Sequence, residues 1–312
     1  MPVRPGRLGY PKEPPISSHP LRSSLALLGA ATIWGLAFVA QRVSLDHFGA
    51  FTFNGLRFAL GALSLIPLTF LFKPSGLSAD QVTWKAALKP GLVAGVVLFI
   101  AAGLQQVGLL WTSAGKAAFL TGFYILLVPI FGMFLKRHPT PGVWVGAVLG
   151  LVGLFFLSVT EAFTVGPGDA LQLLGAVFWT VHILVIDRVS PRLDPLKLSV
   201  VQFAVCSVLS LAVGLPREPF SMVGLQAGLV PLLYAGFGSV GIAYTLQVVG
   251  QRGVPPGPAA LILSLETVFA ALGGGLMLGE ILGPRELLGC GLMLAGMVLA
   301  QVWPVKKVLA SG

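Results

Sequence analysis

The stretch Pro255–Glu280, PPGPAALILSLETVFAALGGGLMLGE, decides the fold. Its apolar run is long enough to cross a bilayer, because a spanning helix needs about 20 residues. One acidic side chain, Glu266, lies near its middle. An ionisable group at that depth costs a few kcal/mol or more, so by default it marks a pathway for a substrate, an ion or a proton. The alternative is a protonated, hydrogen-bonded carboxyl group with a purely structural role.

The composition of the whole chain indicates a polytopic membrane protein. The 312 residues are 55% hydrophobic and 10% charged, with a mean hydropathy of +0.90, whereas soluble domains have about 25% charged residues. The net charge of +9 does not indicate nucleic acid binding, because the basic residues lie in short clusters between apolar runs. Cys206 and Cys290 lie inside apolar runs without metal-ligand spacing. We therefore expect no disulfide, no metal site and no cofactor.

Apolar runs separated by proline, glycine or charge predict an all-α membrane protein with ten transmembrane helices. The expected helices cover residues 24–44, 50–72, 89–110, 115–135, 142–158, 169–187, 196–214, 226–249, 255–279 and 285–303. Residues 1–23 are rich in proline and basic side chains and too polar for the apolar part of a signal peptide, which predicts a disordered cytoplasmic tail. Residues 304–312 are expected to be a cytoplasmic C-terminal tail.

The distribution of basic residues predicts the orientation in the membrane. If the N-terminus is cytoplasmic, fifteen of the 20 lysine and arginine residues fall in cytoplasmic segments and four fall on the other side. The remaining basic residue, Arg57, lies within the second span. Cytoplasmic loops of membrane proteins carry an excess of Lys and Arg. We therefore expect both termini in the cytoplasm.

The chain also repeats itself. The matches are LLGA at 27–30 with LLGA at 173–176, LQQVG at 104–108 with LQVVG at 246–250, and Gly146 and Gly153 with Gly289 and Gly296. The offset drifts slowly from 146 to 142 residues, as it does for two homologous halves. The first repeat is expected at 24–158 and the second at 169–303.

Five spans in each half make this an inverted repeat, because an odd number sends the second copy into the membrane from the opposite side. That architecture is found largely in secondary transporters. Their substrate site lies near the midplane between the repeats, and the halves rock around it to give alternating access.

The sequence resembles the EamA-type branch of the drug/metabolite transporter superfamily. The resemblance rests on the segment 259–300, AALILSLETVFAALGGGLMLGEILGPRELLGCGLMLAGMVLA, and on GKAAFLTGFYILLVP at 115–129 followed by WVGAVLGLVGLFFL at 144–157. It extends over about residues 24–303. The resemblance implies transport of amino acids, other metabolites or toxic compounds, mostly as export.

The resemblance also implies that the third, fourth, eighth and ninth spans line the pathway. The polar candidates on these spans for substrate contact are Gln105, Thr121, Tyr124, Tyr244, Gln247, Ser264 and Glu266. For each tyrosine and glutamine, an interhelical packing role is the alternative. Tyr124 is the repeat partner of Glu266, so the two are expected at similar depth across the pseudo-twofold axis.

Arg57 is a further candidate for contact with substrate or a gate. It lies about two turns inside the second span, where a guanidinium group can instead snorkel to the interface or form a structural pair. Its repeat counterpart is Gln202, because RFA at 57–59 aligns with QFA at 202–204. The fold itself therefore does not require a charge at this position.

Other residues receive structural interpretations. His182 is expected to be a packing residue rather than a proton relay, and Lys116 a solvated residue at a helix start. Pro129 is expected to kink the fourth span. Gly146 and Gly150 on the fifth span are expected to pack against the tenth span within one molecule, with a dimer contact as the alternative.

Two classes of function follow. The favoured one is a secondary active or facilitative transporter of the bacterial inner membrane, not an enzyme. It is expected to export a small metabolite such as an amino acid by alternating access, as a monomer or homodimer. Protons are a candidate coupling ion, and no nucleotide-binding motif indicates direct use of ATP. The alternative is an intramembrane enzyme acting on a lipid or isoprenoid substrate. It is disfavoured because the four histidines are scattered rather than clustered with acidic residues.

Overall fold

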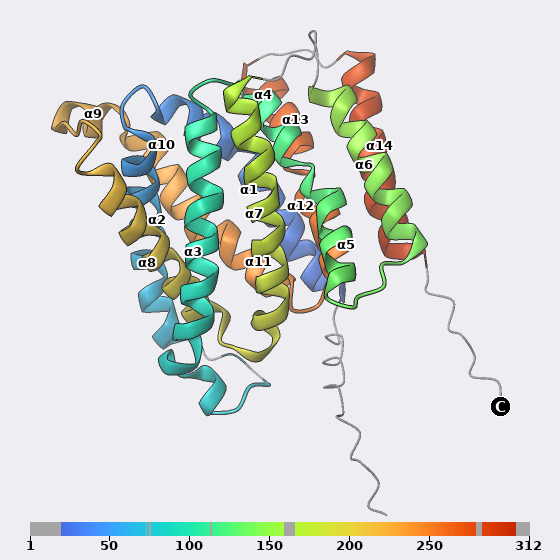
Figure 1. Ribbon diagram of the computed structural model, residues 1–312, viewed down its shortest axis with the longest axis horizontal. Helices are drawn as coiled ribbons and strands as arrows, with labels where there is room; N and C mark the ends of the chain where they lie inside the picture. The colour runs from blue at the N-terminus through green and yellow to red at the C-terminus, as the bar shows by residue number, and fades with distance from the viewer. Residues whose placement is uncertain are drawn as a thin grey trace, which may run out of the picture.

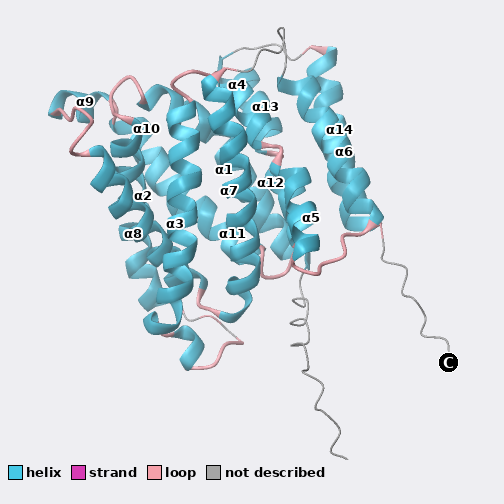
Figure 2. Ribbon diagram, viewed as in Figure 1, coloured by secondary structure: helices cyan, strands magenta, loops and turns pink. Residues whose placement is uncertain are grey.

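The computed structural model describes residues 20–303, except residues 73, 75, 113, 159–165 and 279–282. In these residues the chain is a bundle of helices without strands (Figures 1 and 2). The main helices are α1 (Pro20–Ser44), α2 (Ala50–Leu71), α3 (Trp84–Gly108), α4 (Ala114–Thr121), α5 (Tyr124–Phe134), α6 (Pro141–Ser158), α7 (Pro167–Val189), α8 (Pro195–Gly214), α9 (Met222–Ala227), α10 (Leu229–Leu233), η3 (Tyr234–Tyr244), α11 (Thr245–Gly250), α12 (Pro256–Leu263), α13 (Glu266–Leu278) and α14 (Pro284–Val302). Two short 3₁₀ turns, η1 (Asp80–Val82) and η2 (Ser190–Arg192), occur in the connections.

The predicted ten-span, all-α fold is confirmed. Eight helical segments of the described chain are long and apolar enough to cross a membrane, and two shorter apolar segments, Pro141–Leu157 and Pro256–Leu272, account for the fifth and ninth spans. Large apolar side chains such as Leu63, Phe70 and Val208 are exposed on the outside of the bundle. Lipid rather than water suits such a surface.

We call the end of the bundle where α1 begins and α14 ends the terminal end.

Several helix boundaries follow from local sequence signals. Proline occupies the first turn of α7, α8, α12 and α14, where its missing N–H leaves no hydrogen bond unmade. Asp194 caps α8 by accepting from the backbone N–H of Leu196 and Lys197. α1 and α3 begin four and five residues earlier than predicted, at Pro20 and Trp84.

The sequence predicted continuous helices for the fourth and ninth spans. In the structure both spans are interrupted, at equivalent positions. One break separates α4 from α5 at residues 122–123, and the other separates α12 from α13 at residues 264–265. The backbone bonds match at an offset of 142 residues: Phe123 N–H to Leu120 O with Leu265 N–H to Ile262 O, and Ile125 N–H to Gly122 O with Thr267 N–H to Ser264 O. This shared irregularity is structural support for the repeat.

Proline does not set these breaks, and the kink expected at Pro129 stays a separate prediction. Pro129 lies inside α5, two turns beyond the break. Its repeat counterpart is Ala271, yet the ninth span breaks at the equivalent point. At each break, within residues 120–125 and 262–267, backbone N–H groups donate to the carbonyl oxygen three residues earlier instead of four. These tighter turns interrupt the regular α-helix locally.

The eighth span departs from a regular helix too. Its middle, η3, is a π-helix with the glycine-rich sequence YAGFGSVGIAY. The equivalent residues of the first half, 92–102, are regular α-helix within α3. A π-helical segment often marks a functional site, and this one occurs in only one of the two halves.

Helices of one half pack mainly against helices of the other half. α6 and α14 illustrate the symmetry: a Cβ atom on Gly146 would lie 2.5 Å from the carbonyl oxygen of Gly296, and one on Gly153 would lie 2.5 Å from that of Gly289. Residues of increasing number along α6 contact residues of decreasing number along α14, so the two helices are antiparallel. The predicted glycine packing within one molecule is confirmed, and it has the geometry that an inverted repeat requires.

Candidate functional site

A small cavity lies near the middle of the bundle. Its walls come from α1, α2, α3, α4, α5, α7, η3, α11, α12 and α13, and therefore from both halves. Centres of water-sized molecules can occupy about 50 Å³ of it, which is enough for a few water molecules. Seven of the eight residues predicted for substrate contact line it: Arg57, Gln105, Thr121, Tyr124, Tyr244, Gln247 and Glu266.

Ser264 is the predicted site residue that does not line the cavity. It is buried, and its hydroxyl group donates to the carbonyl oxygen of Leu261 at 2.9 Å. This bond is local to the end of α12, where Ser264 is the C-cap residue. Its position therefore assigns Ser264 to the helix break rather than to the cavity wall.

Two helices outside the expected pathway, α1 and α7, also contribute to the cavity wall. Trp34 and Gln41 on α1 and Trp179 on α7 also line the cavity. The implied pathway helices did not include the first and sixth spans, so no residue on them was a candidate for substrate contact. A signal existed, because an amide and two indoles inside apolar spans need hydrogen-bond partners.

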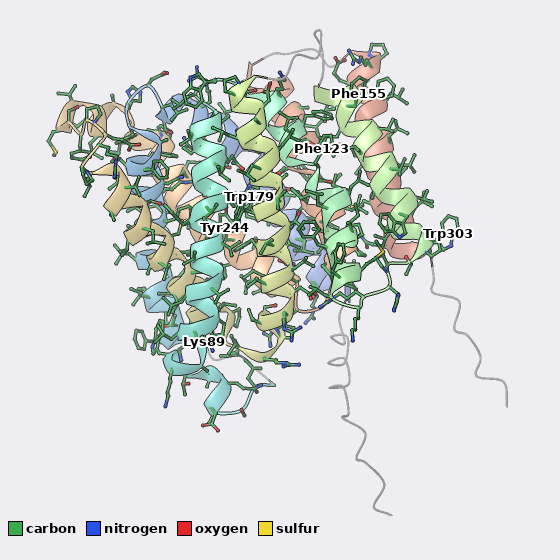
Figure 3. All side chains as sticks on the ribbon, in the orientation of Figure 1. Lys89, Phe123, Phe155, Trp179, Tyr244 and Trp303 are labelled. Carbon is green, nitrogen blue, oxygen red and sulfur yellow. The ribbon has the colours of Figure 1, made fainter. Side chains whose placement is uncertain are left out.

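Aromatic rings form one wall. Tyr244 lies between the two indoles, with its ring centroid 4.7 Å from that of Trp34 and 6.1 Å from that of Trp179. Figure 3 shows Trp179 and Tyr244 close together in the middle of the bundle. The indole N–H of Trp34 donates to the carbonyl oxygen of Ser239 at 3.1 Å. Through this bond α1 holds the π-helical segment at the cavity.

An amide network forms the wall on the side away from the terminal end. Gln105 accepts from the indole N–H of Trp179 at 3.0 Å and donates to the side-chain oxygen of Gln41 at 3.1 Å. Gln172 donates to the carbonyl oxygen of Gln105 at 2.9 Å and accepts from the hydroxyl group of Thr121 at 3.3 Å. Because these groups already bond to one another, the network fixes the wall's shape.

Arg57 is buried, with 2% of its surface exposed. Its Nε donates to Oδ1 of Asn54 at 2.9 Å, and Asn54 in turn donates to the carbonyl oxygen of Ala102 at 3.0 Å. The guanidinium carbon lies 4.9 Å from the ring centroid of Phe58 and 5.6 Å from that of Phe53. The snorkelling interpretation is wrong, because the side chain is held inside the bundle.

Glu266 is the first residue of α13, at the break in the ninth span, and Tyr124 is the first residue of α5 at the equivalent break. Both are buried. In the described part of the chain, no donor forms a hydrogen bond with the carboxyl group of Glu266. The positive end of the α13 dipole favours a negative charge at this position.

Two ion pairs join the fourth span to the sixth, one at each end. Lys116 on α4 lies 2.6 Å from Asp169 on α7, and Arg137 beyond α5 pairs with Asp187 near the other end of α7. The interpretation of Lys116 as a solvated residue is thus wrong. The repeat counterparts of Lys116 and Asp169 are Pro258 and Ser23, which cannot form an ion pair.

His182 does not reach the cavity. It is fully buried, and its Nε2 lies 3.0 Å from the side-chain oxygen of Gln202, the repeat counterpart of Arg57. This contact agrees with the expected packing role.

A second hollow, of about 600 Å³ on the same measure, lies at the terminal end between α5, α6, α12 and α14. Proline and glycine supply much of its wall, and none of the predicted site residues lines it. In the described residues, no group of three or more His, Cys, Asp or Glu could hold a metal ion. The central cavity therefore gathers the candidate binding groups.

Comparison with known proteins places the chain among transporters. The model of the EamA-like transporter family matches residues 21–159 and again residues 166–301. An uncharacterized transporter of Archaeoglobus fulgidus is 31% identical over 90% of this chain and 86% of its own length. The threonine/homoserine exporter RhtA of Escherichia coli K12 is 30% identical over 87% of this chain and 88% of its own length.

A solved crystal structure has a similar fold, with a TM-score of 0.75 over 90% of this chain and 96% of its own at 20% sequence identity. The family model covers both halves separately, as expected for two copies of one five-helix unit. The chain is a multi-pass membrane protein and belongs to the EamA-like transporter family of the drug/metabolite transporter superfamily.

Proposed function

We propose that this protein exports a small amino-acid-like metabolite by alternating access, with the central cavity as its substrate site. The observation that carries the proposal is the position of Tyr124 and Glu266, which begin α5 and α13 at equivalent helix breaks and line one cavity between the halves. Interrupted helices at the interface of inverted repeats are typical substrate sites of secondary transporters. RhtA, a relative of this chain, is named as an exporter of threonine and homoserine.

The proposal includes a cycle in which the cavity opens to one side at a time. The breaks at residues 122–123 and 264–265 supply points at cavity depth where each helix can bend. An ion pair joins the fourth span to the sixth at each end of the bundle, Lys116 with Asp169 and Arg137 with Asp187, and each pair helps to close its own end in turn. We place both termini in the cytoplasm of a bacterial cell with the protein in the inner membrane, so the pair of Lys116 and Asp169 lies at the outer side.

The test is counterflow of labelled threonine in proteoliposomes containing the purified protein, with and without a proton gradient. We expect uptake of label driven by internal unlabelled threonine. A gradient-dependent rate assigns protons as the coupling ion, and a rate that ignores the gradient assigns facilitated diffusion. Absence of counterflow with threonine and every other small amino acid would contradict the proposed function.

A further inference from the structure

Two buried groups of opposite charge line the central cavity, and neither forms an ion pair with the residues that the structure describes. They are the guanidinium group of Arg57 and the carboxyl group of Glu266. Resting on the proposed function of this cavity, we propose that the substrate is a zwitterion whose carboxylate binds Arg57 and whose ammonium group binds Glu266.

The guanidinium group of Arg57 is fixed in orientation but not satisfied. Its Nε is used by Asn54, and the rings of Phe53 and Phe58 lie against it. No hydrogen bond of its two terminal nitrogens occurs in the described residues, and none of the ion pairs found there includes Arg57. Two parallel N–H groups at the end of a held side chain match the two oxygens of a carboxylate.

The carboxyl group of Glu266 is in the same situation with the opposite sign. Glu266 lines the cavity with 7% of the residue's surface exposed, and its carboxyl group accepts no hydrogen bond from the residues that the structure describes. A buried carboxylate is costly unless it is paired and hydrogen-bonded. A primary ammonium group offers three donors and a positive charge, so it compensates this cost.

The two charged groups do not neutralise each other. No nitrogen of Arg57 lies within 4.0 Å of an oxygen of Glu266, and both line the cavity together with the ring of Tyr244. A ligand with both charges satisfies both groups at once. An amine or an acid with the same body satisfies one group and leaves the other buried and unpaired, which lowers its affinity.

The charge on Arg57 is a property of the site rather than of the fold. Gln202 occupies the equivalent position in the second half, where its side-chain oxygen contacts His182. A glutamine therefore fits this helix position in the repeated unit. The fold is therefore expected to accept Arg57→Gln, which removes the positive charge from the cavity. Glu266→Gln is the matching variant that removes the negative charge.

The experiment measures how three probes compete with labelled threonine in counterflow and stabilise the detergent-solubilised protein. The probes are threonine, 1-aminopropan-2-ol, which lacks the carboxylate, and 3-hydroxybutanoate, which lacks the amine. We expect each single-charge probe to bind the unaltered protein at least about tenfold more weakly than threonine, as for the loss of one charged hydrogen bond. We expect Arg57→Gln to weaken the binding of threonine but not of 1-aminopropan-2-ol. We expect Glu266→Gln to weaken the binding of threonine but not of 3-hydroxybutanoate.

Ser207→Ala is the control for general destabilisation, because it removes a buried hydrogen bond to the carbonyl oxygen of Gly55 away from the cavity. Ser207→Ala is expected to weaken the binding of all three probes equally or to leave it unchanged. Equal loss of all three probes in Arg57→Gln and Glu266→Gln would overturn the proposal, as would equal binding of all three by the unaltered protein. If counterflow is seen with uncharged solutes but without preference for zwitterions, the inference fails while the transport function stands.

Discussion

The contact between α6 and α14 allows a sharp test of the inverted-repeat packing. Gly296 faces α6, and a Cβ atom there would lie 2.6 Å from the carbonyl oxygen of Gly146 and 3.2 Å from the backbone nitrogen of Gly150. Gly291 lies on the same helix, but a Cβ atom there meets no atom within 4 Å. Gly296→Ala and Gly291→Ala therefore make the same chemical change on one helix, against opposite surroundings.

The expected cost follows from the missing space. Ordinary van der Waals contact begins near 3.4 Å. The new methyl group at residue 296 would lie about 0.8 Å closer than this to the carbonyl oxygen of Gly146, and it would meet rigid backbone rather than a flexible side chain. The symmetric contact between Gly153 and Gly289 sits at the other end of the interface and limits tilting. Overpacking of this kind costs about 1–3 kcal/mol, whereas Gly291→Ala is expected to be neutral or slightly stabilising.

The assay is thermal unfolding of the two purified variants in the same detergent. A loss of about 1–3 kcal/mol corresponds to a fall in Tm of about 2–5 °C for Gly296→Ala relative to Gly291→Ala. Size-exclusion chromatography checks that both variants have the same oligomeric state. Equal melting temperatures would refute the close backbone contact, and with it the antiparallel packing of α6 on α14.

Three further predictions concern the interior. Lys116→Met leaves the carboxylate of Asp169 buried without its ion partner and is expected to lower stability by up to about 3 kcal/mol; a Lys116→Asp, Asp169→Lys exchange that recovers none of this loss would contradict a direct pair. Trp179→Phe keeps the stack on Tyr244 but loses one hydrogen bond, about 1–2 kcal/mol by chemical denaturation; an unchanged midpoint would count against the bond. Both cysteines are buried, so maleimide is expected to label them only on unfolding, and rapid labelling of the folded protein would show the burial to be wrong.

The sequence was sufficient for the main architecture. The apolar length of each run and the slowly drifting repeat offset predicted ten spans in two inverted halves, because membrane insertion fixes both helix length and direction. Gly146 and Gly150 on the fifth span also predicted the contact of α6 with α14, where a Cβ atom on Gly296 would meet the backbone of both. These features depend on composition and periodicity, which can be read directly from a chain.

Other features depended on interactions that hydropathy does not encode. The breaks at residues 122–123 and 264–265 arise from three-residue turns without a proline signal, and η3 arises within a run that reads as ordinary apolar helix. Seven of the eight proposed site residues line one cavity, but Trp34, Gln41 and Trp179 were missed. Their helices reach the cavity only through packing between the halves, which no local pattern reveals.

The most direct test of alternating access uses one cysteine in the cavity wall. Ser239 lines the cavity, is buried, and differs from cysteine by one atom. Ser239→Cys is placed in a background with Cys206→Ala and Cys290→Ala, and a membrane-impermeant maleimide is added to right-side-out and inside-out vesicles. We predict that residue 239 reacts from both sides and that saturating threonine slows both reactions. Labelling from one side only, under every condition, would contradict a central site that opens alternately to the two sides.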